Sequence, residues 1–187
     1  MRVTDDRYRN ERNRFELAMR MIAHEARTNT IGYFTGLSDD RIRKVYDTYF
    51  RNDDATVRRR RGKSPTQIAP LIESPHRALE SGVLAHLMYR GGLFAAPGSR
   101  QPQLRNNLQL GQCFCDCYEA YRCIVPGPTL TFEWGWNLLS SLRRGDELGL
   151  RQCADCHTWH LHDLLAVPSS ACPVCILMPI VVPRTLN

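Results

Sequence analysis

A chain of 187 residues with 43% hydrophobic and 24% charged side chains has the composition of one folded domain, which excludes a largely disordered protein. The longest apolar run, Ile176–Val182, is interrupted by Pro179 and is far shorter than the roughly 20 residues of a membrane span, so we expect no membrane partner. The N-terminal sequence is too charged for a secretory signal, which predicts a cytoplasmic protein. In that compartment, eight cysteines indicate thiols or metal ligands rather than a disulfide framework.

The excess positive charge is concentrated in one part of the sequence. The formal net charge is +6; residues 1–65 hold 16 Lys and Arg against 10 Asp and Glu, whereas the remainder holds 9 of each. Within the first part, residues 41–65 alone carry 9 positive and 3 negative charges. A cluster of positive charges attracts a polyanion, and in a cytoplasmic protein the most common polyanion is the phosphate backbone of a nucleic acid. The sequence therefore predicts nucleic-acid binding.

Two helices and a short element between them are predicted before residue 50. Residues 10–27 predict an amphipathic helix, and residues 28–36 predict a short helix or turn that ends at Gly36. Ser38 then caps a helix with the sequence DRIRKVYDTYF, whose first turn is acidic. The apolar face of the first helix is expected to consist of Phe15, Ala18, Met19, Ile22, Ala23 and Ala26. That of the capped helix is expected to consist of Ile42, Val45, Tyr46 and Tyr49.

This order of elements is the helix-turn-helix pattern, in which the second helix lies in the major groove of DNA. Many ordinary helical hairpins share the pattern, but here a basic arm between Asn52 and Pro65 follows it. Such an arm commonly contacts adjacent phosphates, whereas a solvated linker is the alternative for four consecutive arginines. The candidate DNA-binding residues are Arg41, Arg43 and Lys44 on the helix and Arg58, Arg59, Arg60, Arg61 and Lys63 on the arm.

Residues 66–148 predict a helical core without a catalytic constellation, so we expect no enzymatic activity. Ser74 and Pro75 begin a helix that ends near Arg90, and its core side is expected to be Leu79, Val83, Leu84, Leu87 and Met88. A second helix is predicted over Leu104–Ile124, and a third begins after Thr131 and closes near Gly145. Four cysteines in the second helix are expected to be small buried side chains, with a second metal or redox site as the alternative. They are Cys113, Cys115, Cys117 and Cys123.

The remaining cysteines form the pattern C-x2-C-x15-C-x2-C, which is typical of a structural zinc site. The predicted ligands of one Zn²⁺ are Cys153, Cys156, Cys172 and Cys175. The residues between the two pairs predict a small two-stranded excursion. Three histidines in that interval, His157, His160 and His162, are alternative ligands. A zinc enzyme that uses His157, His160 or Asp163 is disfavoured because four thiolates leave no open position on the metal.

The order of these features resembles the flagellar transcriptional activator FlhC family. Two stretches carry the resemblance: Thr35–Phe50, with its Gly-Leu-Ser turn, and Thr131–Cys175, with TFEWGWNLLSSLRRGDELGLRQC before the cysteines. The resemblance implies an all-α protein with a four-cysteine zinc site. It also implies a hetero-oligomer with an FlhD-type regulator that binds promoters of flagellar (class II) operons and helps RNA polymerase to engage. After Cys175, the sequence ILMPIVVPRTLN differs from the basic tail expected of the family.

The sequence therefore predicts a mostly helical chain with a small zinc-ribbon-like lobe. Its parts are a helix-turn-helix-like segment with a basic arm (1–65), a helical core (66–148) and a C-terminal zinc-binding lobe (149–187), together forming one compact unit. The predicted function is that of a DNA-binding activator subunit. The alternative is a zinc-stabilised module whose basic patch binds RNA or an acidic protein without sequence-specific DNA binding.

Overall fold

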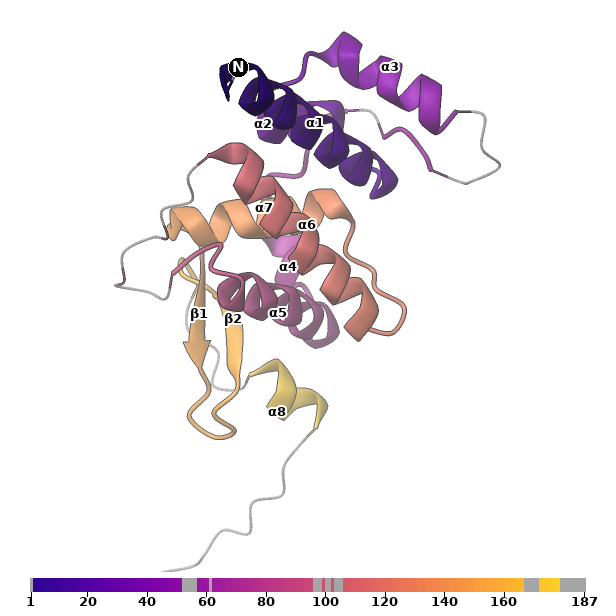
Figure 1. Ribbon diagram of the computed structural model, residues 1–187. Helices are drawn as coiled ribbons and strands as arrows, with labels where there is room; N and C mark the ends of the chain where they lie inside the picture. The colour runs from indigo at the N-terminus through magenta and orange to yellow at the C-terminus, as the bar shows by residue number, and fades with distance from the viewer. Residues whose placement is uncertain are drawn as a thin grey trace, which may run out of the picture.

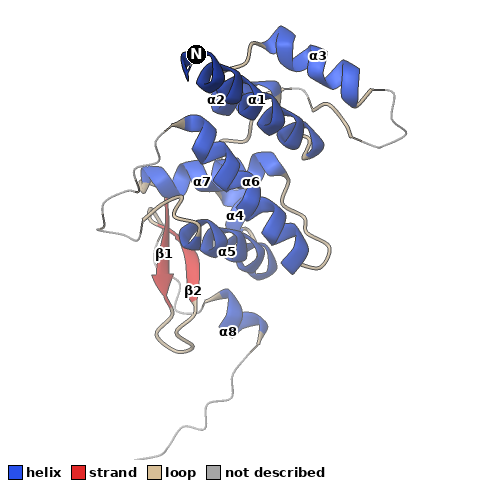
Figure 2. Cartoon of the chain, viewed as in Figure 1, coloured by secondary structure: helices blue, strands red, loops and turns tan. Residues whose placement is uncertain are grey.

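The computed structural model describes residues 2–51, 57–60, 62–95, 99, 102, 106–166 and 172–178. Over these residues the chain forms eight helices and one two-stranded sheet (Figures 1 and 2). The prediction of a mostly helical protein with a small C-terminal lobe is confirmed at this level. None of the described helices is both long enough and apolar enough to cross a membrane.

Three helices form the N-terminal end of the molecule: α1 (Arg2–Ala23), α2 (Thr28–Thr35) and α3 (Asp39–Tyr49). Helix α2 ends because Gly36 adopts a left-handed conformation with φ of 68° and donates its N–H to the carbonyl of Gly32. Ser38 occupies the N-cap position of α3 in an extended conformation, as predicted, but its side chain makes no capping hydrogen bond. The predicted elements are therefore present, and a connection of residues 36–38 joins α2 to α3.

The predicted apolar face of α1 is partly wrong. The helix buries Leu17 and Met21 beside the expected Ala18 and Ile22, whereas Ala23 is exposed. Helical spacing fits two adjacent stripes equally well, and the positions of α2 and α6 decide which stripe is covered. The helix also begins eight residues before the predicted start, in a segment where Arg9 pairs with Asp6 three residues earlier, and it ends at Ala23 rather than at residue 27.

The helical core consists of α4 (Ala69–Ile72), α5 (Pro75–Arg90), α6 (Asn107–Ile124) and α7 (Phe132–Arg144). The predicted caps are confirmed: Ser74 Oγ accepts the N–H of Arg77 at 3.2 Å, and Thr131 Oγ1 accepts that of Trp134 at 3.5 Å. The predicted start of the second core helix at Leu104 lies outside the described residues. Aromatic rings from three elements meet in the centre, at centroid distances of 4.7 to 6.1 Å. They are Phe34, Phe114, Phe132 and Trp136.

Helix α5 does not bury the whole of its predicted core side. It buries Leu84 and Met88 as expected, together with Ala78, Ser81 and Ala85. The expected core residues Leu79, Val83 and Leu87 are only half-buried and line a surface groove. The helix thus has two apolar sides, and the described residues cover one of them.

The N-terminal helices are joined to the core by an ion-pair cluster on α1 and α6. Arg20 donates to Glu119 through Nε and Nη2, each at 2.6 Å, and to Asp116 at 2.5 Å. The ring of His24 lies 2.8 Å from Glu119 Oε1. The hydrogen bonds from Arg20, with a further one from His24, lower the pKa of Glu119 to about 2.

Replacing Glu119 with Gln is expected to lower the free energy of unfolding by about 1 kcal/mol, a value reduced for the partial exposure of the carboxylate. Because the folded-state pKa lies below the unfolded value, this stabilisation is present near neutral pH. It is lost as the pH falls from about 4.5 towards about 2. Urea titrations of the two proteins at pH 7 and pH 3 measure the difference. A difference that is the same at both pH values would contradict this assignment.

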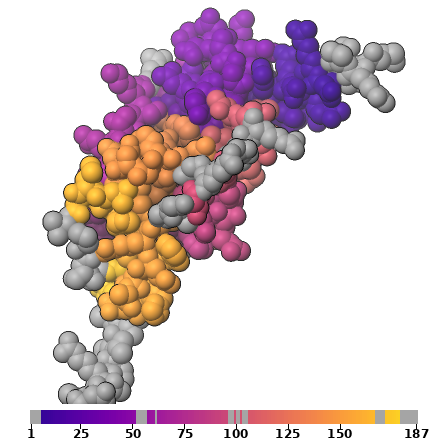
Figure 3. All heavy atoms as spheres, turned by 90° about the vertical axis from the view of Figure 1, so that its left-hand side faces the viewer, coloured from indigo at the N-terminus to yellow at the C-terminus, as the bar shows by residue number. Residues whose placement is uncertain are grey.

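The C-terminal lobe consists of β1 (Leu148–Gln152), β2 (Trp159–Asp163) and α8 (Pro173–Leu177). The strands are antiparallel, with Leu148 opposite Asp163. The predicted excursion between the cysteine pairs is wrong in one respect: its first strand precedes Cys153, so the turn that holds the first cysteine pair is itself the hairpin loop. The space-filling view places the N-terminal helices and this lobe at opposite ends of the molecule (Figure 3).

Candidate metal centre and basic surface

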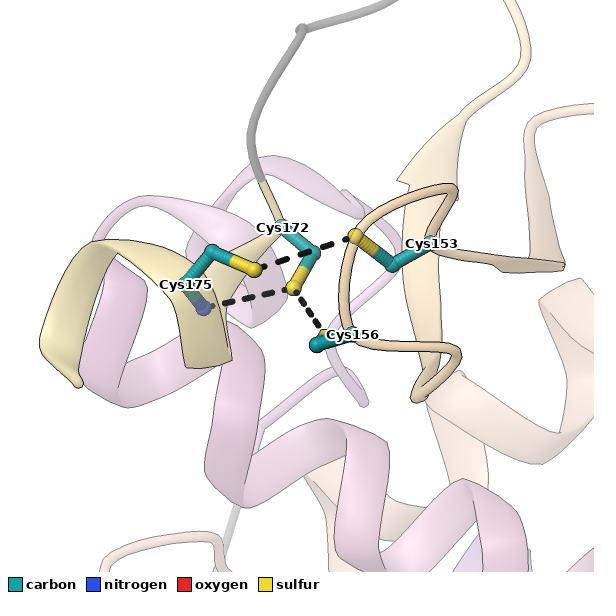
Figure 4. A group of neighbouring side chains, drawn as sticks. All are labelled: Cys153, Cys156, Cys172 and Cys175. Carbon is teal, nitrogen blue, oxygen red and sulfur yellow. Dashed lines mark hydrogen bonds between the residues drawn. The ribbon is translucent and has the colours of Figure 1, made fainter. Parts of the chain in front are cut away.

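The four predicted metal ligands come together from two separate segments of the lobe (Figure 4). Cys153 directly follows β1, and Cys156 lies in the loop before β2. Cys172 is the N-cap of α8, and Cys175 lies in the single turn that follows. The hairpin loop and the start of α8 therefore supply two thiols each.

The distances among the thiols fit one metal ion. The four Sγ atoms lie within 4.8 Å of one another. Cys153 Sγ is 3.9 Å from that of Cys175, and Cys156 Sγ is 3.4 Å from that of Cys172. A tetrahedron with metal–sulfur bonds of about 2.3 Å has edges of about 3.8 Å. A disulfide would need about 2.05 Å, and all four cysteines are free.

Hydrogen bonds favour the thiolate at Cys156 and Cys153, whereas contacts with Cys156 and Cys172 raise the pKa of Cys175. Hydrogen bonds from Thr158 lower the pKa of Cys156 to about 6. The backbone N–H of Cys156, followed by that of Asp155, lowers the pKa of Cys153, whereas burial raises the pKa of Cys172. The N–H of Cys175 donates to Cys172 Sγ at 3.3 Å. Metal ions bind cysteine as the thiolate, so the donors at Cys153 and Cys156 support ligation by the first cysteine pair.

The histidines between the cysteine pairs are not part of this group. Among the described residues, no histidine or carboxylate joins the four thiols within 4.8 Å. His157 is exposed, with a left-handed φ of 57°. His160 is buried, and its Nε2 accepts a hydrogen bond from Arg151 Nε at 3.1 Å.

The cysteines of α6 differ in their surroundings. Cys115 and Cys117 are buried as predicted, and burial raises their pKa values to about 12 and about 11. Cys113 is half-buried. Cys123 is exposed, so the prediction of a buried side chain is wrong there, because it lies near the C-terminal end of α6 beyond its packed face. Within the described part of the chain, these thiols belong to no group that could hold a metal.

The three predicted contacts on α3 do not share one environment. Ile42 and Val45 are buried against the other N-terminal helices, so Arg43 and Lys44 lie on the exposed side. Arg43 pairs with Asp40 one turn earlier, at 3.0 Å. Arg41 is instead paired with Glu11 of α1, which lowers the pKa of that carboxylate. Lys44 is exposed and lies next to Arg43, so these two side chains form the outward basic part of α3.

The described part of the basic arm runs beside α3 and the α1–α2 junction. Tyr46 Oη on α3 donates to the carbonyl of Val57 at 3.0 Å. Glu25 accepts from the backbone N–H of Arg58 at 3.2 Å and pairs with the guanidinium of Arg60 at 2.7 Å. These contacts bring the arm and α3 together. Arg59 is half-buried and donates to Thr28 at 3.5 Å; Lys63 is exposed; Arg61 lies outside the described residues.

A buried carboxylate that the sequence analysis missed holds the end of the arm. Glu133 is only 2% exposed and accepts from the N–H of Arg27 at 2.7 Å, Thr30 Oγ1 at 3.0 Å and Ser64 Oγ at 2.5 Å. In the sequence, Glu133 is simply an acidic residue in the first turn of a helix, where it interacts favourably with the helix dipole. Nothing in the sequence therefore indicates that its carboxylate is buried and accepts hydrogen bonds from distant residues.

Compared with protein-family models and with curated proteins, the sequence matches none.

Proposed function

We propose that this chain is a DNA-binding subunit of a transcriptional activator resembling FlhC. The observation that carries the proposal is the contact between α3 and the arm through Tyr46 and Val57. That contact holds the arm beside α3. The proposed DNA-binding surface consists of the exposed basic residues of these two segments, Arg43, Lys44, Arg58, Arg60 and Lys63, which we call the basic surface. Such a surface suits the closely spaced phosphates of a nucleic acid.

In the proposed complex, α2 and α3 act as a helix-turn-helix, with α3 in the major groove. The left-handed Gly36 and the short connection to Ser38 support this assignment, since the motif joins its helices by a short turn that often contains glycine. Arg43 and Lys44 lie in the second turn of α3, which follows the first turn from which recognition helices mainly contact base edges. The arm contacts the flanking phosphates. Arg41 forms an ion pair with Glu11 of α1, so in this proposal it contributes less to DNA binding than the sequence alone predicts.

The proposed metal is one Zn²⁺, held by Cys153, Cys156, Cys172 and Cys175. Four thiolates complete a tetrahedral shell, so in this proposal the ion stabilises the lobe and carries out no chemistry. Four thiolates and one divalent ion add a net charge of −2, which changes the formal +6 of the chain to about +4. Helix α3, which carries Arg43 and Lys44, lies at the opposite end of the molecule from α8 (Figure 1).

The remaining parts of the proposal depend on the family resemblance. They are an FlhD-type partner in a hetero-oligomer, promoters of flagellar (class II) operons as targets, and the engagement of RNA polymerase. The alternative remains a zinc-stabilised module whose basic surface binds RNA or an acidic protein.

The salt dependence of duplex binding tests the basic surface. For a variant with Arg58, Arg60 and Lys63 all replaced by Ala, we expect the slope of log affinity against log salt to become shallower by about 2.7. Three phosphate contacts account for this, at about 0.9 each. Fluorescence anisotropy with a labelled duplex between 50 and 200 mM salt measures the slope.

The matched control removes the same charge from exposed arginines of the core and its end, namely Arg90, Arg122 and Arg144. We expect its slope to equal that of the unmodified chain. Equal slopes for all three proteins would contradict the basic surface as the DNA-binding site. Tighter binding to single-stranded RNA or to an acidic polypeptide than to duplex DNA at the same salt would favour the alternative function.

A further inference from the structure

Glu25 has an unusual backbone conformation just beyond the end of α1. Its N–H donates to the carbonyl of Ile22 at 2.8 Å, and the N–H of Ala26 donates to that of Met21 at 3.0 Å, so the helix ends in a Schellman motif. The motif requires a left-handed residue, and Glu25 has a φ of 58°. Glycine is the usual residue at this position, because a side chain makes the left-handed region unfavourable. A glutamate here therefore indicates a role for its side chain.

The carboxylate of Glu25 holds the basic arm at two points. Oε1 accepts the backbone N–H of Arg58 at 3.2 Å. Oε2 accepts the Nε–H of Arg60 at 2.7 Å and lies 2.7 Å from Nη2 of the same guanidinium. The side chain of Glu25 is only 25% exposed, whereas that of Arg60 is 47% exposed. The carboxylate is thus mostly buried at the α1–α2 junction, and the guanidinium binds it from the surface.

The edge of Arg60 that binds Glu25 is also suited to a phosphate. Nε and Nη2 donate side by side, and arginine binds carboxylates and phosphates through such pairs of donors. One edge cannot hold both anions, so a phosphate that binds there must displace the carboxylate. Glu25 would then keep a mostly buried negative charge without its cationic partner, which is unfavourable.

We propose that Glu25 competes with nucleic-acid phosphate for Arg60, and that this competition lowers the affinity of the basic surface. The inference rests on the proposed DNA binding and names a residue that limits it. Glu11 pairs with Arg41 in a similar way, but its side chain is 53% exposed, so water replaces that pair more easily. Glu25 is therefore expected to be the stronger competitor.

A double-mutant cycle with a labelled duplex tests the competition. At constant salt, we expect Glu25→Gln to raise the affinity about fivefold, the factor for an exposed ion pair at the strong end of the usual range. In an Arg60→Gln background we expect the same change to have no effect, because Glu25 then has no guanidinium to hold.

The matched control is Glu16→Gln, which removes the same charge from an exposed position of α1 that pairs with Arg12. We expect it to change the affinity by less than about twofold, because salt screens exposed charges. A gain from Glu25→Gln that persists in the Arg60→Gln background would overturn the proposal, since net charge alone would explain it. Unchanged or weaker binding by Glu25→Gln would overturn it as well.

The unbound protein gives a second readout that does not require DNA. Nuclear magnetic resonance follows the Nε–H signal of Arg60, which is identified by its absence from Arg60→Gln. We expect this proton to exchange with water faster in Glu25→Gln than in the unmodified chain. Equal exchange rates, or equal affinities of variants that do bind the duplex, would overturn this inference alone. The absence of duplex binding by every variant would instead contradict the proposed function, and this inference with it.

Discussion

Replacement of Cys172 with Ser is expected to abolish stoichiometric metal binding and to unfold the C-terminal lobe while α1–α7 stay folded. Serine keeps the helix cap, because its hydroxyl accepts the N–H of Cys175 as the thiol does, but it supplies no thiolate. The lobe consists of two five-residue strands and a five-residue helix. Elements this short are not stable alone, and a structural zinc contributes roughly 10–16 kcal/mol of binding free energy.

Two measurements check this expectation. Native mass spectrometry counts metal ions per chain, and hydrogen exchange reports the protection of amides in β1, β2 and α8. The matched control is Cys123→Ser, which changes an exposed thiol of α6 and is expected to keep one metal per chain. A Cys172→Ser protein that still binds one ion and keeps the lobe protected would exclude the cluster as a structural centre.

Replacement of Glu133 with Ala is expected to lower the free energy of unfolding by about 3 kcal/mol. The change removes a buried acceptor and leaves three donors, on Arg27, Thr30 and Ser64, without their partner. Hydrogen bonds to a charged group contribute about 1.5–3 kcal/mol each, and water reaching the vacated space restores part of the loss. Ser64 lies at the end of the arm and is held by Glu133, so its release is expected to raise amide hydrogen exchange over residues 57–64.

Urea denaturation compares this variant with a matched one, Glu147→Ala. Glu147 is 40% exposed at its side chain and pairs with Arg144 at 3.2 Å, so its removal is expected to cost less than about 1 kcal/mol. Equal midpoints for the two variants would show that Glu133 has no special structural role. Glu133→Gln keeps one acceptor oxygen, and an intermediate loss is expected for it.

Local features of the structure were predictable from the sequence because they depend on residues close together in the chain. The left-handed Gly36 and the caps at Ser74 and Thr131 involve contacts within four residues. The spacing within each cysteine pair likewise predicted the thiol cluster, since each pair occupies one turn. The location of the excess charge also follows from the sequence directly.

Apart from the cysteine cluster, the contacts between residues far apart in the sequence were decided by the tertiary structure. Periodicity fits adjacent stripes of a helix equally well, so only packing determined that α1 buries Leu17 and Met21. The hairpin required a partner strand before Cys153, and neither strand indicates the other by its sequence.

The same limit applies to the basic surface. The residues are present in the sequence, but Arg41 lies beside Glu11, Arg60 beside Glu25, and Ser64 beside Glu133 across 69 positions. A single sequence does not indicate such pairings, because a charged or polar side chain can be exposed to water as readily as it can bind a distant partner. The sequence by itself thus determined most of the longer helices, several of their capped ends, the cysteine cluster and the location of the excess positive charge. The packed structure decided which charges face outward and which apolar sides remain open, because burial is a property of the whole fold.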